Sequence, residues 1–118
     1  MKKLIFIALT FFAAQLTAQT YKTGLVAKDA KIVQAGSGYS FTEGPAVAPD
    51  GRVYFTDQPN DRIYVWDEKA GISLWLEGTG RSNGMFFDSR GRLVTCADEK
   101  HHIAYFDDNK KLVPVINE

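Results

Sequence analysis

The chain of 118 residues is poor in cysteine and carries no net charge. It has one cysteine, Cys96, and its 14 Lys and Arg residues are matched by 14 Asp and Glu residues. A single cysteine excludes a disulfide framework within the chain. The balanced charge lacks the basic excess of nucleic-acid-binding domains, so we expect no nucleic-acid partner. Because Cys96 lies in an apolar stretch, we expect a buried thiol rather than a nucleophile.

The sequence also lacks an apolar run that could cross a membrane. The most apolar run, Leu4–Ala14, falls short of the ~20 residues that a transmembrane helix needs. It follows Lys2 and Lys3 and is closed by the small residue Ala18, an order typical of secretory signal peptides. We predict a signal peptide at residues 1–18 and an exported protein, periplasmic or secreted, without a transmembrane anchor. An uncleaved N-terminal anchor is the alternative.

What the sequence does contain is an internal repeat with an offset of about 40 residues. The aligned segments are Glu43-Gly44-Pro45 with Asn83-Gly84-Met85, Gly51-Arg52-Val53 with Gly91-Arg92-Leu93, and Trp66-Asp67 with Phe106-Asp107. A period in the forties that is rich in strand residues is typical of the four-stranded blades of a β-propeller. Several strand segments are apolar on both faces, as expected for a blade between two neighbours. The sequence therefore predicts an all-β propeller chain.

The repeat divides the chain into four parts. Residues 1–18 are the signal peptide, residues 19–40 a leader, residues 41–80 the first blade and residues 81–118 the second. In the leader, residues 31–34 could form one short strand that closes the ring by pairing with a last blade. The strands of the first blade are expected at residues 45–48, 53–56, 62–66 and 72–76. Because propellers have about four to eight blades, we expect two blades to be part of a larger ring.

Two polar residues stand at equivalent places before the inner strands of the two blades. In a propeller, Glu43 and Asn83 would point towards the mouth of the central channel. Carboxylate and amide oxygens there would suit a hard divalent cation such as calcium, and the channel would give a ligand a concave pocket. The alternative is that these side chains bind backbone amides or face water.

Other polar and aromatic residues have simpler interpretations. We expect Asp57 to be a turn residue rather than a metal ligand. His101 and His102 are neighbours whose side chains would diverge in a strand, so we expect loop residues that do not chelate one metal together. Arg81 could contact an anionic substrate or simply face solvent. The residues expected to pack between blades are Trp66, Trp75 and Phe106.

The motifs resemble a known family. The segments Phe41–Pro45, Pro49–Asp57 and Asn60–Asp67 resemble the opening of the gluconolactonases, which are grouped with regucalcin and luciferin-regenerating enzyme. Ser82–Asp88 followed by Gly91-Arg92-Leu93 resembles their second blade. The resemblance implies a six-bladed propeller with one divalent metal, usually calcium, on its axis. It maps the family's metal-binding glutamate onto Glu43 and makes Asn83 a candidate for the substrate pocket.

The resemblance also implies an activity. The full protein would be a metal-dependent hydrolase that opens small-molecule sugar lactones or related esters. The remaining metal ligands and the catalytic base of such enzymes would lie beyond residue 118, so no catalytic residue is assigned. We expect the 118-residue chain alone to be inactive and poorly soluble. The alternatives are a non-catalytic propeller that binds a ligand or a partner, since fold does not dictate function, and an inactive truncated fragment.

Overall fold

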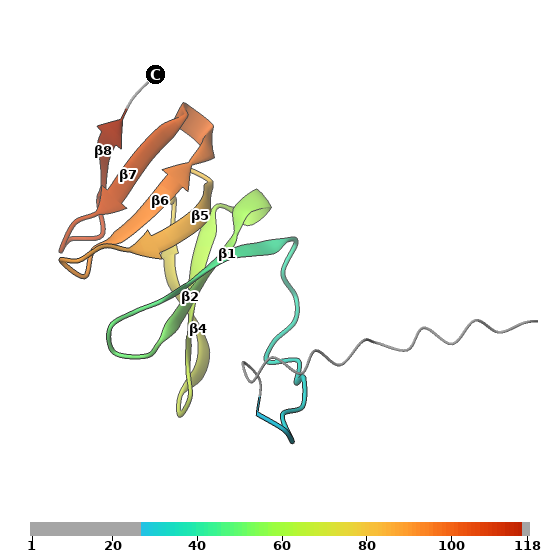
Figure 1. Ribbon diagram of the computed structural model, residues 1–118. Helices are drawn as coiled ribbons and strands as arrows, with labels where there is room; N and C mark the ends of the chain where they lie inside the picture. Colours follow the sequence, from blue (N-terminus) through green and yellow to red (C-terminus); the bar gives the residue numbers. More distant parts are fainter. Residues whose placement is uncertain (1–26, 117–118) are drawn as a thin grey trace, which may run out of the picture. The chain divides into compact units, whose positions relative to one another are not determined.

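A computed structural model describes residues 27–116, and in this range the protein is built from β-strands (Figure 1). Two four-stranded antiparallel meanders, called sheet 1 and sheet 2, have the strand orders β1-β2-β3-β4 and β5-β6-β7-β8. The strands of sheet 1 are β1 (Thr42–Val47), β2 (Val53–Asp57), β3 (Arg62–Asp67) and β4 (Gly71–Glu77). Those of sheet 2 are β5 (Ser82–Phe87), β6 (Leu93–Ala97), β7 (His102–Phe106) and β8 (Leu112–Ile116). The predicted all-β class with two blade-like units is confirmed.

Both sheets belong to the compact unit of residues 33–118. The predicted signal peptide, residues 1–18, lies outside the described residues. Residues 31–34, which could form one short strand by pairing with a last blade, have no strand structure. The physical reason is that a strand needs a neighbour, and no strand among the described residues pairs with this segment. The part of the chain that the structure describes contains no helix long and apolar enough to cross a membrane.

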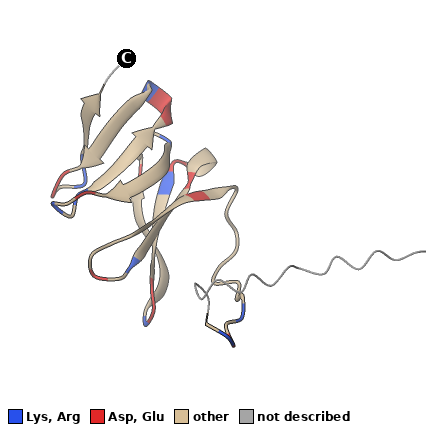
Figure 2. Cartoon of the chain, in the orientation of Figure 1, with Lys and Arg blue, Asp and Glu red and all other residues tan. Residues whose placement is uncertain are grey.

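The sheets repeat their connections as well as their strands. A short 3₁₀ helix follows the second strand of each sheet, η1 (Gln58–Asn60) and η2 (Asp98–Lys100). At the opposite end, Gly51 and Gly91 turn the chain with φ of 89° and 76°, a backbone conformation that glycine adopts without steric cost. Figure 2 shows that charged residues of both signs lie mostly at these loops and turns. The middles of the strands are thereby left for packing.

The core lies between the two sheets. Ile63 of β3 is fully buried there, with Tyr54 and Phe106 each 5% exposed. A chain of edge-to-face aromatic contacts crosses the interface, with centroid distances of 5.3 Å for Phe87–Tyr54, 5.4 Å for Tyr54–Trp75 and 5.2 Å for Trp75–Phe106. Such pairs contribute about 0.5–1.5 kcal/mol each beyond the area that they bury. The prediction that Trp75 and Phe106 pack between blades is confirmed.

One prediction of burial fails and another is not tested, because each sheet has an outer face. Trp66 lines an apolar groove with Phe55 and Ile72 on the face of sheet 1 that points away from sheet 2, where no second sheet is described against which it could pack. Cys96, expected to be buried, is exposed. Along β6, Leu93, Thr95 and Ala97 face sheet 1, and the intervening positions point away. Cys96 is exposed although β6 is apolar, because no described residue covers the face of sheet 2 on which it lies.

Candidate functional site

The two predicted site residues lie where the innermost strands of both sheets depart from regular pairing. In the β1–β2 pair, the register shifts between Glu43 and Ala46. In the β5–β6 pair, it shifts at the equivalent place, between Ser82 and Met85. Such irregularities are β-bulges, which re-aim side chains and are over-represented beside functional sites. Each bulge coincides with a motif identified in the repeat, Glu-Gly-Pro in the first unit and Asn-Gly-Met in the second.

Close contact between the backbones of β1 and β5 brings the two motifs together (Figure 1). Gly44 has a φ of +57°, and a Cβ atom there would collide with the backbone carbonyl oxygen of Asn83 and lie 3.2 Å from the Cα atom of Gly84. Only glycine both adopts this positive φ without strain and lacks the Cβ atom that would collide here. Glu43 and Asn83 thus occupy adjacent strands at the same level of the repeat, and both are partly buried.

The side chains of Glu43 and Asn83 are not used to hold the fold together. Neither makes a hydrogen bond or an ion pair with another described residue. The main chain of Glu43 is held instead, because the Thr56 hydroxyl donates a hydrogen bond to its carbonyl oxygen at 3.0 Å. A carboxylate and an amide so placed could contribute oxygen ligands to a hard cation or hydrogen bonds to a polar ligand. Within residues 27–116, however, no three His, Cys, Asp or Glu side chains converge as a metal cluster.

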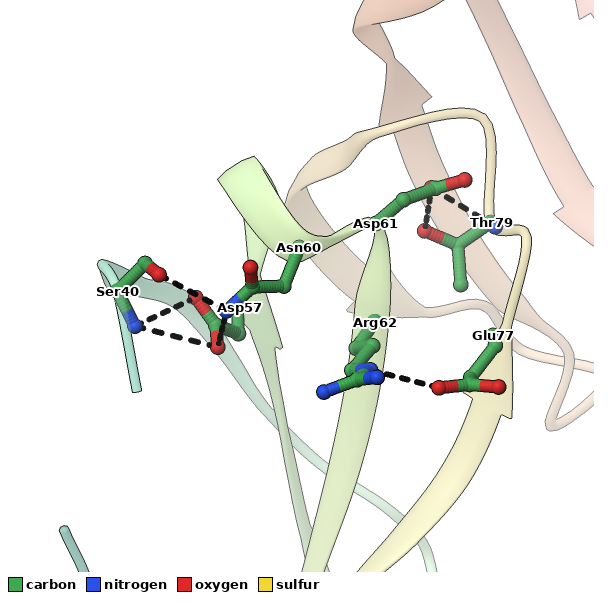
Figure 3. A network of polar contacts seen from close by, with 7 residues as sticks. All are labelled: Ser40, Asp57, Asn60, Asp61, Arg62, Glu77 and Thr79. Atoms are coloured by element: carbon green, nitrogen blue, oxygen red, sulfur yellow. Dashed lines mark hydrogen bonds and ion pairs between the residues drawn. The ribbon is translucent and has the colours of Figure 1, made fainter. Parts of the chain in front are cut away.

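Asp57 is a structural carboxylate rather than a ligand (Figure 3). It is 1% exposed, and its oxygens accept hydrogen bonds from the amides of Ser40 at 3.1 Å and Phe41 at 3.0 Å and from Nδ2 of Asn60 at 2.8 Å. Burial raises the pKa of Asp57, but these donors together outweigh burial and hold its pKa below the usual value. The carboxylate therefore fastens the incoming chain to the start of sheet 1, a larger role than that of the expected turn residue.

A second carboxylate, Asp61, ties down the connection between the sheets (Figure 3). Its Oδ1 atom accepts hydrogen bonds from the backbone amide of Thr79 at 2.9 Å, from the Thr79 hydroxyl at 2.8 Å and from the Arg81 amide at 2.6 Å. Thr79 and Ser82 are fully buried and hydrogen-bonded to each other. Sequence reasoning missed this network, because no local pattern reveals that residue 61 faces residues 79–81.

Three further candidates have no arrangement that favours ligand binding. Arg81 is exposed, and its Nη2 atom donates to Oε1 of Gln58 at 3.4 Å, so it braces a loop. His101 adopts a left-handed turn conformation with φ of 53°. His102 is the first residue of β7 rather than a loop residue, which corrects that prediction. The structure brings neither histidine to Glu43.

A cavity of about 280 Å³ at the turn end of the two sheets was not predicted. Its lining includes the aromatic residues Tyr54 and Phe87 and the charged residues Arg52, Arg90 and Asp50. Because Arg52 and Asp50 form an ion pair at 2.7 Å, their charges offset each other in this lining. The cavity lies at the opposite end of the strands from η1 and η2, beside the turns that follow β1 and β5.

Comparisons with known proteins identify structures with a similar fold. No protein-family model matches the chain, and no curated protein matches it. Among solved structures, a gluconolactonase from Xanthomonas campestris is 24% identical with a TM-score of 0.63, over 66% of this chain and 27% of that chain. A protein provisionally assigned as a gluconolactonase is 20% identical with a TM-score of 0.64, over 70% and 29%. A streptogramin B lyase is 17% identical with a TM-score of 0.52, over 61% and 25%.

These similarities concern architecture. The chain spans between 25% and 29% of the length of the three proteins that it resembles. At identities of 24% and below, the likeness shows the fold and not the activity. Two consecutive four-stranded meanders, packed face to face and repeated at a fixed offset, are successive blades of a β-propeller. The described residues thus have the fold of part of a β-propeller.

Proposed function

We propose that this chain is part of an exported, metal-dependent hydrolase that opens sugar lactones or related esters. The observation that carries the proposal is the pair Glu43 and Asn83, held on adjacent innermost strands with side chains that no described residue binds. The resemblance of both motifs to gluconolactonases supports the same assignment, as does the structural similarity to proteins of that kind. Export rests on the signal-peptide pattern of residues 1–18.

In this proposal Glu43 is one ligand of a calcium ion. Its carboxylate suits a hard cation, and the Thr56 hydroxyl fixes the main chain from which it projects. When bound, such an ion would polarise a substrate carbonyl and favour the charge that develops on its oxygen. One carboxylate does not make a calcium site, so further oxygen ligands must come from other units of the ring.

In this proposal Asn83 binds the substrate rather than the metal. Its side-chain amide can both donate and accept hydrogen bonds, as a polyhydroxylated substrate requires. The backbone of β5 at Asn83 touches β1 at Gly44, and in this proposal the Asn83 amide faces the same mouth as the Glu43 carboxylate. Asn83 would therefore orient the substrate, and no catalytic base is assigned within residues 27–116.

The first test is the DNA sequence that follows the Glu118 codon in the source genome. A reading frame that continues through further repeats, with Asn or Asp at the later strand starts, would support the enzyme. A genuine stop codon would leave Glu43 without partner ligands and would remove the proposal in favour of an inactive fragment.

The second test is biochemical and applies to the longest form of the protein that the source encodes. Glu43→Gln should weaken calcium binding at least about tenfold, equivalent to about 1.4 kcal/mol, as measured by isothermal titration calorimetry. It should lower lactone hydrolysis in parallel. The matched control is Glu68→Gln, in the exposed turn between β3 and β4. Equal calcium affinity in both variants, or an active lactonase without metal, would contradict the proposal. Ligand binding without hydrolysis would favour the non-catalytic alternative.

A further inference from the structure

The connection between the two sheets, residues 78–81, leads to Asn83 and contains a strained residue. Gly78, Gly80 and Arg81 have φ of 72°, 69° and 52°. Glycine adopts this left-handed region without cost, whereas the Cβ atom of Arg81 makes it unfavourable there. Residues other than glycine that are held in such conformations cluster at functional sites. The strain lies two positions before the candidate substrate-binding residue, so we asked what holds it in place.

A carboxylate from sheet 1 holds the connection in this conformation (Figure 3). Oδ1 of Asp61 accepts hydrogen bonds from the Arg81 amide at 2.6 Å and from the amide and the hydroxyl of Thr79 at 2.9 and 2.8 Å. The Thr79 hydroxyl in turn accepts a hydrogen bond from the Ser82 amide at 3.2 Å, and both residues are fully buried. A chain of hydrogen bonds therefore runs from Asp61 to the residue before Asn83.

The other side of the connection is held by the short helix η2. The amides of Asp98 and Glu99 donate hydrogen bonds to the carbonyl oxygens of Arg81 at 3.3 Å and Gly80 at 3.1 Å. The connection is thus fastened to sheet 1 by a side chain and to sheet 2 by the backbone. Only the fastening to sheet 1 can be removed by a substitution that leaves the backbone intact.

The repeat separates this role of the carboxylate from a role in the local turn. The counterpart of Asp61 is His101, and both residues have a φ of 53°. Each also donates its amide to the first residue of the preceding 3₁₀ helix, to Gln58 at 3.1 Å and to Asp98 at 3.4 Å. The turn therefore forms with either side chain. The carboxylate of Asp61 is not needed to make it and serves the connection instead.

We propose that Asp61 is a positioning residue that sets the place of Asn83 through Thr79 and Ser82, and thereby the affinity for substrate. This role rests on the proposed function, in which Asn83 orients the substrate. Asp61 acts only through the hydrogen bonds of the connection and is not itself a ligand. Loss of its carboxylate should therefore weaken substrate binding and leave calcium affinity, which depends on Glu43, unchanged.

The first experiment uses the longest form of the protein that the source encodes, with gluconolactone as the probe substrate. Asp61→Gly keeps the left-handed turn and removes the carboxylate, so kcat/KM should fall at least about tenfold, mainly through KM. Calcium affinity, measured by calorimetry, should change less than about twofold. Asp61→Asn keeps an acceptor oxygen and should restore most of kcat/KM. Lys110→Gly is the matched control, because Lys110 has a φ of 58° in the turn between β7 and β8. Calcium affinity that fell together with kcat/KM would overturn the proposal.

The second experiment repeats the comparison in an Asn83→Ala background. If Asp61 acts through Asn83, Asp61→Gly should lower kcat/KM less than about twofold once residue 83 is alanine. A merely structural carboxylate would cause the same loss in both backgrounds, which overturns the proposal. Thr79→Val removes the hydroxyl that links Asp61 to Ser82 and keeps the shape of the side chain. It serves in the same cycle if Asp61→Gly does not fold, with an expected loss of at least about threefold that also requires Asn83.

A third measurement needs no substrate and separates this proposal from the proposed function. The Ser82 amide binds Thr79 and not Asp61, so it reports on the place of the segment before Asn83. Its hydrogen exchange, followed by NMR, should be at least about tenfold faster in Asp61→Gly than in the wild type. A wild-type protein that does not hydrolyse the lactone would remove the proposed function, and the exchange would still decide whether Asp61 fixes the start of β5. Unchanged exchange would overturn the positioning role whatever the activity.

Discussion

The hydroxyl of Thr56 donates a hydrogen bond to the main-chain carbonyl oxygen of Glu43 at 3.0 Å. Thr56 is fully buried on β2, opposite Glu43 in the β1–β2 pairing. The bond therefore braces the strand just before its register shifts, at the position from which the candidate metal ligand projects. The repeat counterpart of Thr56 is Cys96, which is exposed, so this support is specific to the first unit.

Replacement of Thr56 by valine tests this support. Valine keeps the shape and removes the donor, so the free energy of unfolding should fall by about 1–3 kcal/mol, the cost of leaving a buried acceptor unsatisfied. Thr56→Ser keeps the hydroxyl and is the control, with a smaller loss from the missing methyl group. Urea denaturation of both variants gives the comparison. Equal stability of the valine and serine variants would show that the hydroxyl does not support Glu43.

Gly44 offers a second test, with Gly84 as its built-in control. Gly44→Ala forces an L-residue into a left-handed conformation and drives its Cβ atom into the Asn83 carbonyl group, so it should cost about 2 kcal/mol or more. Gly84→Ala meets no atom within 4 Å and needs no positive φ, so it should change stability by about 0.5 kcal/mol or less. Thermal or urea unfolding measures both. If the two alanine variants were equally stable, β1 and β5 would not touch as described.

The two sheets and the equivalent positions of Glu43 and Asn83 could be predicted from the sequence. The repeat and the alternation of strand and turn residues predicted both sheets, because strand pairing within a meander is local and each Gly-containing turn marks its own hairpin. The same register placed Glu43 and Asn83 at equivalent positions, and the structure brings their strands together through Gly44.

What could not be read from the sequence depends on contacts between distant segments. The carboxylates of Asp57 and Asp61 bind backbone amides that lie about 16 and 18 residues away, and no local motif specifies such partners. The exposure of Cys96 depends on whether a neighbour covers its face, and the alternation along β6 does not contain that information.

Thr95 leads to a prediction of gained stability. Its side chain is 1% exposed in the interface between the sheets, and its Oγ1 atom has no hydrogen-bond partner among the described residues. Thr95→Val removes the unsatisfied hydroxyl and keeps the shape, so the free energy of unfolding should rise by about 1–2 kcal/mol. Thr95→Ser keeps the hydroxyl, opens a small cavity and should destabilise. A valine variant less stable than the wild type in urea would show that the hydroxyl has a partner, such as a buried water.

Asp57 gives the stability of the protein a dependence on pH. The amides of Phe41 and Ser40 and the side chain of Asn60 hold the pKa of Asp57 below its ordinary value of about 3.9, although burial acts in the opposite direction. A carboxylate whose folded-state pKa lies below its unfolded-state pKa contributes stability that is fully present above the unfolded value. That contribution is lost as the pH falls through the folded value.

Asp57→Asn should therefore lower the free energy of unfolding by about 1–3 kcal/mol at pH 7. The reason is that the NH2 group of the new asparagine would face N–H groups that now donate to the carboxylate. The difference from the wild type should shrink as the pH is lowered towards 3, where the wild-type carboxyl is itself losing its charge. Asp50→Asn, which removes an exposed ion pair with Arg52, is the control and should cause a smaller loss. Urea unfolding at a series of pH values separates the two variants. A difference between wild type and Asp57→Asn that stayed constant from neutral to acid pH would mean that the ionised carboxylate does not fasten residues 40 and 41 to sheet 1.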